Sequence, residues 1–528
     1  MKINRFILFF ILFHPITIIA QNGKLDNSFS DNGIVTTAVG EKNDIAYDLA
    51  IQSDGKIVVA GISQNSQGMY DFAVVRYNIN GTPDNGFSSD GKVITSVIEG
   101  TEYANGVAIQ EDGKIVVAGN TILNNAPYDD YVLVRYNSDG TLDQSFHSGG
   151  IVKTNISRTD KGRSVAIQPD GKIVVAGYSY SGTTYDFSMV RYFSDGSLDT
   201  AGFGDKGKVM TDITQDNDYG MGMALQTNGK IIVVGTANRK LAIVRYNQDG
   251  SVDTDFGSGG ATLISLENGL VGNDESVTIQ PDNKIVVSCS YYNQDGLSKI
   301  AVVRCDTTGA PDTEWGTDGI VKTSIGDSDD ESSGIALQTD GKVLVSGFSF
   351  SSSSGDNFAL VRYNTDGTPD NNFGNNGILT TSVAGGDGYD DAYAMTVDDD
   401  KIILCGRADN GSDYDFAVVR YLQNSTTAIR SEIINTAPDL FQNYPNPFHN
   451  NTVIKYTVPE ISDAGIHPRV TLAVYDREGR KIATLVDKHQ SPGIHQVIFH
   501  APALAAGVYF YKLQVDHSIV TRKLVVVK

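Results

Sequence analysis

Short hydrophobic runs separated by glycine-containing turns recur along most of the chain. Lys56–Ile62 and Asp71–Tyr77 are apolar at successive positions, which indicates strands buried on both faces. With Ala46–Gln52 before them and Lys92–Val97 after them, they predict a unit of four antiparallel strands. Between Ala46–Gln52 and Lys56–Ile62, the pair Asp54-Gly55 predicts a two-residue type I′ hairpin turn.

This unit is copied along the chain, as the arginine near the end of its third strand shows. Successive arginines lie 59, 56, 54, 59, 58 and 58 residues apart. A fixed period of this length marks one supersecondary unit repeated in sequence. Seven four-stranded units predict an all-β, seven-bladed β-propeller. The arginines are Arg76, Arg135, Arg191, Arg245, Arg304, Arg362 and Arg420.

The last unit lacks a fourth strand, whereas an extra strand of that type, Ile34–Val39, precedes the first unit. We therefore expect this amino-terminal strand to complete the seventh blade beside Asp415–Tyr421 and to close the ring. Closure of this kind hides a strand edge that would otherwise be exposed.

The repeated units follow the pattern DGKIVVAG…DFAVVRYNxDGxxDxxFGxxG. Over about residues 22–421 this pattern resembles the delta-60 repeat family of bacterial secreted proteins. The resemblance implies a β-propeller-like array and brings no established chemistry. The fifth unit departs most from the pattern, with Asn283 and Cys289 in place of glycines and Cys305 in place of tyrosine.

The amino terminus has the pattern of an export signal. Residues 1–20 have a basic start, an apolar run and a small residue at Ala20, which is typical of a cleaved secretory signal. The apolar run is short for a membrane span. No long apolar segment follows it, so we expect the mature chain, from residue 21, to have no membrane span.

The carboxyl-terminal part departs from the repeat. Residues 422–440, rich in Ser, Thr and Asn, predict a linker, and about six alternating strands in 441–528 predict a small β-sandwich. The segments NYPNPF, VYDREGRKIATL, GVYFYKL and TRKLVVVK resemble the type A sorting domain of the type IX secretion system. The resemblance implies that the secretion machinery of a Bacteroidota-type bacterium recognises residues 441–528. It also implies passage across periplasm and outer membrane, removal of the tail, and attachment to the cell surface or release.

The variable loops on one face of the predicted propeller are rich in Tyr, Ser, Gly and Asn, which suits an adaptable binding surface for a glycan or a protein. Solvated turns without a ligand are the alternative. Arg158, Lys161 and Arg163 add positive charge to this face. The candidate ligand-binding residues are Tyr178, Tyr180, Tyr185, Tyr219, Tyr291, Tyr292, Arg239 and Lys240.

An acidic residue precedes the first strand of nearly every unit, and Asp274 is the nearest equivalent in the fifth. These acids could form a ring that attracts a cation at the channel mouth; the alternative is that each caps the loop of its own unit. The candidate ring is Asp44, Glu102, Asp160, Asp218, Asp330 and Asp390.

Composition narrows the function. The net charge of −22 opposes binding to nucleic acid. The propeller contains a single histidine, His147, which argues against a Ser-His-Asp triad or a multi-histidine metal site, and we assign no catalytic residue, metal or cofactor. Calcium stays open, because Asn364-x-Asp366-Gly367-x-x-Asp370 resembles a calcium loop without its terminal glutamate. We expect a monomeric, non-enzymatic binding protein; a polysaccharide hydrolase or lyase and a structural surface-coat protein are the alternatives.

Overall fold

The computed structural model describes residues 23–123, 129–269, 274–352, 354–385, 388–423, 438, 440–443, 446, 448–449, 451–459, 468–490, 493–501, 504–516 and 518–527. The chain divides into two compact units, one up to residue 425 and one from residue 426 onward. The expected signal (1–20) and most of the expected linker (422–440) lie outside the described residues. Across the described residues every regular element is a strand, and no helix is long and apolar enough to cross a membrane.

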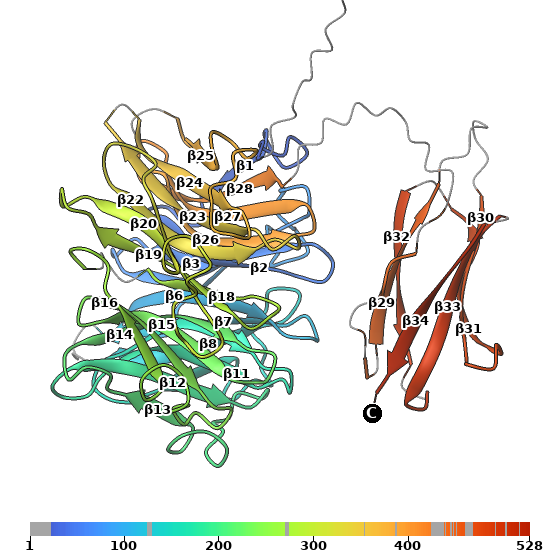
Figure 1. The fold of residues 1–528 in the computed structure, drawn as a ribbon, viewed down its shortest axis with the longest axis horizontal. Helices are drawn as coiled ribbons and strands as arrows, with labels where there is room; N and C mark the ends of the chain where they lie inside the picture. Colours follow the sequence, from blue (N-terminus) through green and yellow to red (C-terminus); the bar gives the residue numbers. More distant parts are fainter. Residues whose placement is uncertain are drawn as a thin grey trace, which may run out of the picture. The chain divides into compact units, whose positions relative to one another are not determined.

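In its described part, the first unit contains seven four-stranded antiparallel sheets arranged as a β-propeller (Figure 1). We number them sheet 1 to sheet 7 in chain order of their first strands. The first strands are β2 (Asp44–Ile51), β6 (Gly100–Ile109), β10 (Asp160–Ile167), β14 (Asp218–Leu225), β18 (Ser276–Ile279), β22 (Asp330–Leu337) and β26 (Asp391–Asp398). The second strands are β3 (Ile57–Gln64), β7 (Ile115–Leu123), β11 (Ile173–Tyr180), β15 (Ile231–Ala237), β19 (Ile285–Tyr292), β23 (Val343–Ser351) and β27 (Lys401–Asp409).

The outer two strands of each sheet follow the same order. The third strands are β4 (Tyr70–Tyr77), β8 (Asp129–Tyr136), β12 (Tyr185–Tyr192), β16 (Lys240–Tyr246), β20 (Ser298–Cys305), β24 (Gly355–Tyr363) and β28 (Tyr414–Leu422). The fourth strands of sheets 1 to 6 are β5 (Lys92–Thr95), β9 (Ile151–Thr154), β13 (Lys208–Thr211), β17 (Ala261–Ile264), β21 (Ile320–Thr323) and β25 (Ile378–Thr381).

The fourth strand of sheet 7 comes from the other end of the unit. β1 (Ile34–Thr37) pairs antiparallel with β28, from Ile34 opposite Val419 to Thr37 opposite Phe416. The Asp26 amide also donates to the Arg420 carbonyl at 2.8 Å. The predicted pairing of this early strand with the last repeat is therefore confirmed, and it covers the edge of β28.

The hairpin turn between the first two strands differs from its prediction. Gly55 has φ +82°, whereas Asp54 is not in the positive-φ region. The Gly55 amide donates to the Gln52 carbonyl, and the Gln52 amide donates to the Lys56 carbonyl. These bonds define a three-residue loop, a type I turn followed by a left-handed glycine, so the type I′ prediction was wrong.

The hydrophobic core lies between neighbouring sheets. One fully or almost fully buried cluster joins Val59 and Val75 of sheet 1 to Cys405 and Val418 of sheet 7. Burying each such side chain stabilises the fold by about 1.5–3 kcal/mol. The first and last sheets therefore pack against each other as consecutive sheets do.

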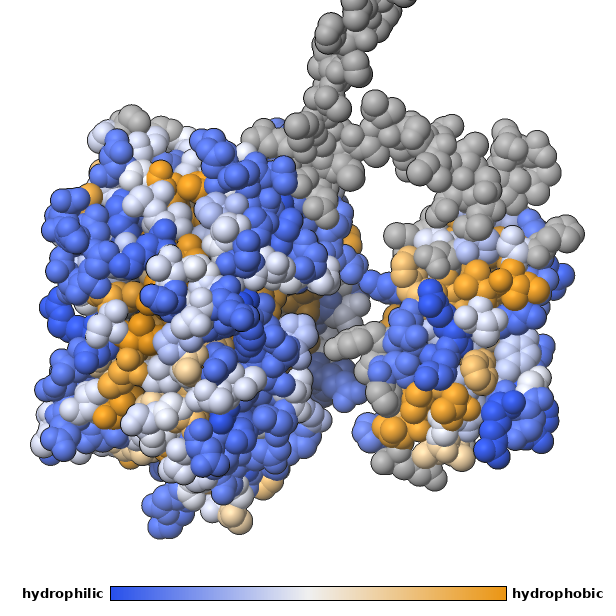
Figure 2. Space-filling view, in the orientation of Figure 1, coloured by the Kyte–Doolittle hydropathy of each residue, from blue (hydrophilic) through white to orange (hydrophobic). Residues whose placement is uncertain are grey.

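The second unit has a two-stranded sheet, β29–β32, and a four-stranded sheet in the order β31-β30-β33-β34. One core is shared by both sheets, as expected of the predicted β-sandwich; it includes Ile454, Phe499, Leu472 and Leu513. Figure 2 shows hydrophobic side chains among hydrophilic ones on the surface of this unit, where Ile498 and Ile519 are exposed. The strands are β29 (Asn451–Val458), β30 (Arg469–Tyr475), β31 (Lys481–His489), β32 (Gly493–His500), β33 (Gly507–Val515) and β34 (Ser518–Val526).

Candidate functional site: a central pocket and a tyrosine cluster

The repeated arginines are structural. Arg362 donates to Asp370 (Nε to Oδ2, 2.9 Å) and to the Gln423 carbonyl (2.9 Å), and its guanidinium lies 4.1 Å from the Phe373 ring centroid. Burial alone would raise the pKa of Asp370. Hydrogen bonds from Lys342 and the Asn372 amide, with the charge of Arg362, lower it below its ordinary value.

Each of the seven arginines has an aspartate partner and an aromatic ring beside its guanidinium. In sheet 7 the partners come from the amino-terminal segment: Arg420 donates to Asp26 at 3.0 Å and lies 4.3 Å from the Phe29 ring centroid. Arg420 also donates to the Ile79 carbonyl, which belongs to the connection between β4 and β5 of sheet 1. We call this arginine–aspartate–aromatic arrangement the staple.

The six acids of the expected cation ring each bind backbone amides of their own loop. Asp44 accepts from the Val39 and Gly40 amides, and Glu102 accepts from the Val97 and Ile98 amides. Asp160, Asp218, Asp330 and Asp390 repeat this pattern. All six are at most 2 % exposed. Burial raises the pKa of Glu102 to about 7 against these hydrogen bonds. The arrangement is that of loop caps, the alternative weighed above.

In sheet 5, Asp274 is not the structural equivalent of these acids. Ser276 pairs with Ser288, as Gly334 pairs with Ser346 in sheet 6. Asp274 therefore corresponds to Ser332, two residues after the acid position.

Four of the predicted tyrosines form one cluster on the variable-loop face. Tyr178 lies edge-on to Tyr185 (ring centroids 5.5 Å apart) and to Tyr219 (5.1 Å), and Tyr180 lies 5.2 Å from Tyr185. Tyr178 is buried, and the other three are half-buried. The Tyr178 hydroxyl accepts from Arg163 Nη2 at 3.3 Å. We call these four residues the tyrosine cluster.

The other predicted ligand-binding residues lie elsewhere. Arg239 sits in the β15–β16 turn with φ +61° and donates to the Asn268 carbonyl at 2.7 Å, and Lys240 beside it is exposed. The Tyr292 amide donates to Gly269, while Tyr291 is buried with Lys322 Nζ 5.0 Å from its ring centroid. Among the described residues, no ring contact joins this group to the tyrosine cluster.

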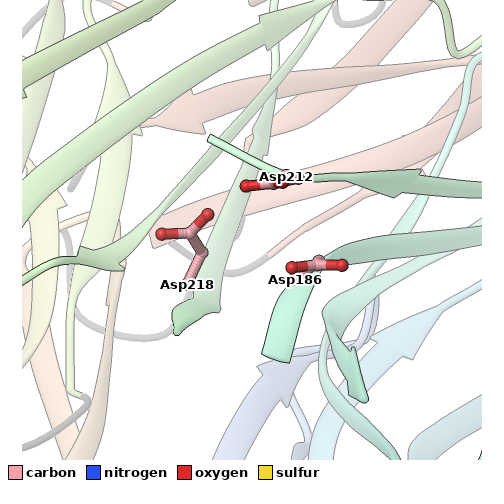
Figure 3. Close-up of side chains that lie close together, drawn as sticks. All are labelled: Asp186, Asp212 and Asp218. Atoms are coloured by element: carbon pink, nitrogen blue, oxygen red, sulfur yellow. The ribbon is translucent and has the colours of Figure 1, made fainter. Parts of the chain in front are cut away.

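Three carboxylates approach one another beside the tyrosine cluster. Asp186, Asp212 and Asp218 each offer an oxygen within 4.8 Å of the others (Figure 3). Local donors already bind each of them: Thr184 Oγ1 to Asp186, the Gln215 amide to Asp212, and loop amides to Asp218. In the calcium-like loop, Asp366 accepts from the Thr368 amide and hydroxyl, and Asp370 belongs to a staple.

A glycine in the second strand produces a bulge in the first. A Cβ on Gly177 would lie 1.8 Å from the Lys161 carbonyl oxygen. Gly61, Gly119, Gly235, Gly347 and Gly406 are equally close to the strand beside them. In these six sheets the first strand shifts register just after this contact, so that one residue bulges out of the ladder. Sheet 5 has Cys289 at this position, and its first strand begins only at Ser276.

The bulged residues of these six sheets and the equivalent residue of sheet 5 meet in one central pocket of about 270 Å³. Sheet 5 contributes Asp274 and Glu275, which precede its shortened strand. The equivalent residue is not constant among the sheets, unlike the staple arginine; only sheets 1 and 7 share one, a tyrosine. In chain order these residues are Tyr47, Asn105, Arg163, Met221, Glu275, Ser333 and Tyr393.

The pocket has a charged side and an aromatic side. Glu275 is 4 % exposed; its Oε1 accepts from Thr236, whereas its Oε2 is buried without a hydrogen-bond partner. Arg163 Nε is also buried without one. Tyr47 and Tyr393, from sheets 1 and 7, have ring centroids 5.3 Å apart.

Burial changes the ionisation of the pocket acids. It raises the pKa of Glu275 to about 8, because the Thr236 hydrogen bond and the charge of Arg163 compensate only in part. Desolvation also raises the pKa of Asp274, although this residue is exposed. At neutral pH, Glu275 is therefore mostly a neutral acid that can donate a hydrogen bond.

This pocket was not predicted from the sequence, although the sequence contains a signal for it. The segments that start at Tyr47, Asn105 and Arg163 align as YDLAIQSDGK, NGVAIQEDGK and RSVAIQPDGK. Their last positions repeat, and their first position does not. Arg163 was expected on a basic surface, but it lines the pocket instead.

Comparison with known proteins supports the repeat architecture. Residues 52–87, 110–146, 168–201, 226–256, 280–314 and 338–373 match the family described as domain of unknown function (DUF5122) β-propeller. Residues 442–527 match the secretion system C-terminal sorting domain. No curated protein matches the chain.

Several solved structures are similar at low identity. A protein of unknown function from Dyadobacter fermentans is 11 % identical (TM-score 0.39, covering 76 % of this chain and 100 % of that one). Sqt1 from Chaetomium thermophilum is 12 % identical (TM-score 0.38, 80 % and 97 %). A Trypanosoma rangeli sialidase in complex with sialic acid is 8 % identical (TM-score 0.35, 93 % and 89 %). At these low scores, none of them indicates what this protein does.

The sorting domain indicates export through the type IX secretion system to the cell surface or the medium. The chain thus contains six segments that match the DUF5122 β-propeller repeat and a carboxyl-terminal segment that matches the secretion system C-terminal sorting domain.

Proposed function

We propose that the seven sheets form a closed seven-bladed ring, and that this ring is an exported, non-enzymatic binding protein for an extracellular glycan or protein. Contacts between first strands continue from sheet to sheet and return from β26 to β2, which supports closure. The Arg420 staple, with partners in Asp26 and Ile79, supports it further.

The proposed domain boundaries are those predicted from the sequence: a removable signal (1–20), the propeller (21–421), a linker (422–440) and the sorting domain (441–528). The division of the chain near residue 425 and the match over residues 442–527 agree with it. In this proposal the secretion machinery recognises the sorting domain, and the propeller acts as a monomer outside the cell.

The observation that carries the binding function is the tyrosine cluster. Its aromatic rings lie on rigid strands beside variable loops, and Tyr185, Tyr219 and Tyr180 are only half-buried. Tyrosine offers a large apolar face and a hydroxyl at little entropic cost on binding, which suits both glycans and protein surfaces. Through Tyr178 and Arg163, the cluster is continuous with the central pocket.

The test is binding of the purified mature chain to a glycan array and to extracts of cell-surface proteins. We expect saturable binding that weakens roughly tenfold or more in Tyr185→Ala and Tyr219→Ala. Phe193→Ala is the matched control, because Phe193 is an exposed aromatic in a third-to-fourth-strand connection on the other face. No saturable ligand, or an equal loss in the control, would overturn the proposal. Turnover of a polysaccharide that stops after one carboxylate is changed would replace binding with catalysis.

A further inference from the structure

The central pocket is the part of the propeller where the repeat is least regular. The sheets share the staple, the hairpin glycine and the acidic loop cap, with sheet 5 as the main departure, but the bulged residue varies among them. Different residues at equivalent positions around one cavity do not make the fold more stable than one repeated residue would. The variety is expected if these positions together contact one asymmetric molecule.

The polar side of the pocket has hydrogen-bonding capacity that the protein leaves unused. Glu275 Oε2 and Arg163 Nε are both buried and unpaired. Leaving such atoms without partners is costly, by an amount comparable to a lost hydrogen bond. Arg163 supplies donors, and a neutral Glu275 supplies both a donor and an acceptor. A ligand that carries several hydroxyl groups would satisfy both residues.

The aromatic side offers a complementary surface. Tyr47 and Tyr393 come from sheets 1 and 7, whereas Arg163 and Glu275 come from sheets 3 and 5. In the order of sheet contacts around the propeller, the tyrosines therefore lie opposite the polar pair. An occupant needs an apolar face on one side and polar groups on the other.

We propose that the central pocket binds a single hexose-sized sugar residue, with its apolar face on Tyr47 and Tyr393 and its hydroxyl groups bonded to Arg163 and Glu275. The pocket volume of 270 Å³ is just below the usual range for drug-sized ligands, about 300–1,000 Å³, which fits one sugar ring. The inference rests on the proposed binding function and narrows it, because the residue can be the end of a glycan held at the tyrosine cluster.

Calorimetric titration of the mature chain with methyl glucoside, methyl galactoside, methyl mannoside and glucuronate tests the proposal. Cadaverine and lysine serve as amine probes. We expect at least one sugar to bind saturably at one site and the amines not to bind. Glu275→Ala and Arg163→Met should each weaken sugar binding roughly tenfold or more.

The pH dependence identifies Glu275 as the donor. The groups that face it are Arg163, Asp274 and the Cys289 thiol. If neutral Glu275 donates to the sugar, affinity falls as the pH rises above about 8. Glu275→Gln keeps an uncharged donor, so it should retain affinity within about threefold and lose the decline. Met221→Trp narrows the pocket and leaves Arg163 and Glu275 unchanged in the sequence. It should abolish sugar binding in a protein that still unfolds cooperatively.

The outcomes separate this proposal from the wider one. Glycan binding that depends on Tyr185 and Tyr219 but not on Glu275, Arg163 or Met221 would overturn the pocket assignment and leave the proposed function intact. Binding of the amines instead of sugars would overturn the ligand class. Monosaccharide binding that Met221→Trp leaves unchanged would place the sugar elsewhere.

Discussion

Two sets of positions occur in every sheet of the propeller and behave in opposite ways. The staple arginine is the same in all seven sheets and meets an aspartate, an aromatic ring and a carbonyl of the following sheet in each. The bulged residue varies, although its place in the first strand is the same in the six sheets that have the bulge. A position that makes the same structural contacts in every sheet requires the same residue type in every sheet. Positions that face one shared cavity can differ, so variation at an otherwise repeated position indicates ligand recognition, whereas constancy indicates a structural role.

The largest expected effect comes from removing the strand that completes sheet 7. Deletion of residues 23–37 exposes the edge of β28 and takes Asp26 and Phe29 from the Arg420 staple. We expect aggregation and loss of cooperative unfolding, measured by size-exclusion chromatography and calorimetry. Deletion of residues 441–528 is the control and should leave the unfolding temperature of the propeller unchanged. A 23–37 deletion that melts like the parent chain would show that the ring does not depend on this strand.

The next largest effect compares a staple formed within one sheet, that of Arg362, with the staple of Arg420, whose aspartate and aromatic partners come from the amino-terminal segment. Arg362→Met and Arg420→Met each remove the buried cationic partner of an aspartate, which keeps its remaining donors, including Lys342 for Asp370 and Ser28 for Asp26. Breaking such a buried pair should lower the free energy of unfolding by about 3–5 kcal/mol in each variant. Arg480 lies beside Asp476 with its side chain 76 % exposed, so its change to methionine should affect the free energy of unfolding far less than either staple variant does. Chemical denaturation measures all three. A much smaller cost for Arg420 than for Arg362 would mean that the ends of the propeller are loosely joined.

The sequence predicted the architecture because each unit repeats the same local rules. Alternating turns and buried strands, the arginine period and the extra strand near Ile34 led to the seven sheets and to the β1–β28 pairing. The bulge was not predictable in this way, because a register shift leaves the hydrophobic pattern on either side almost unchanged. Strand register likewise showed that Asp274 does not match the acid of the other units, which residue spacing had misjudged.

The glycine opposite the bulge should be intolerant of any side chain in six sheets. Gly177→Ala places a Cβ 1.8 Å from the Lys161 carbonyl oxygen, so we expect a loss of about 2–3 kcal/mol or more. In sheet 5 the equivalent change, Cys289→Ala, removes one buried sulfur atom and should cost about 1 kcal/mol. Equal costs in denaturant unfolding would contradict the link between this glycine and the bulge.

Glu275 should make the folded protein less stable as the pH rises into the alkaline range. Its pKa rises from an ordinary 4.5 to about 8 in the folded protein. Between these values the folded state holds more protons than the unfolded state, so this contribution to stability falls as the pH rises through the window. Glu275→Gln should therefore melt a few degrees above the parent at pH 9 and close to it at pH 5. The exposed Glu111→Gln is the control, and the same upward shift there would remove the assignment.

The smallest expected effect exchanges one bulged residue for another. Asn105 donates to the Gly162 carbonyl of the next sheet at 2.7 Å, and Ser333 donates to the equivalent Ala392 carbonyl at 2.6 Å. Asn105→Ser therefore keeps a side-chain donor that, at the equivalent position of sheet 6, bonds the same backbone carbonyl. The free energy of unfolding should change by no more than about 0.5 kcal/mol. The same substitution enlarges the pocket, so relative affinities for the methyl hexosides should change while the melting temperature does not. If stability instead fell as far as in Arg362→Met, the bulged positions would be structural elements, and their variety would need an explanation other than a ligand.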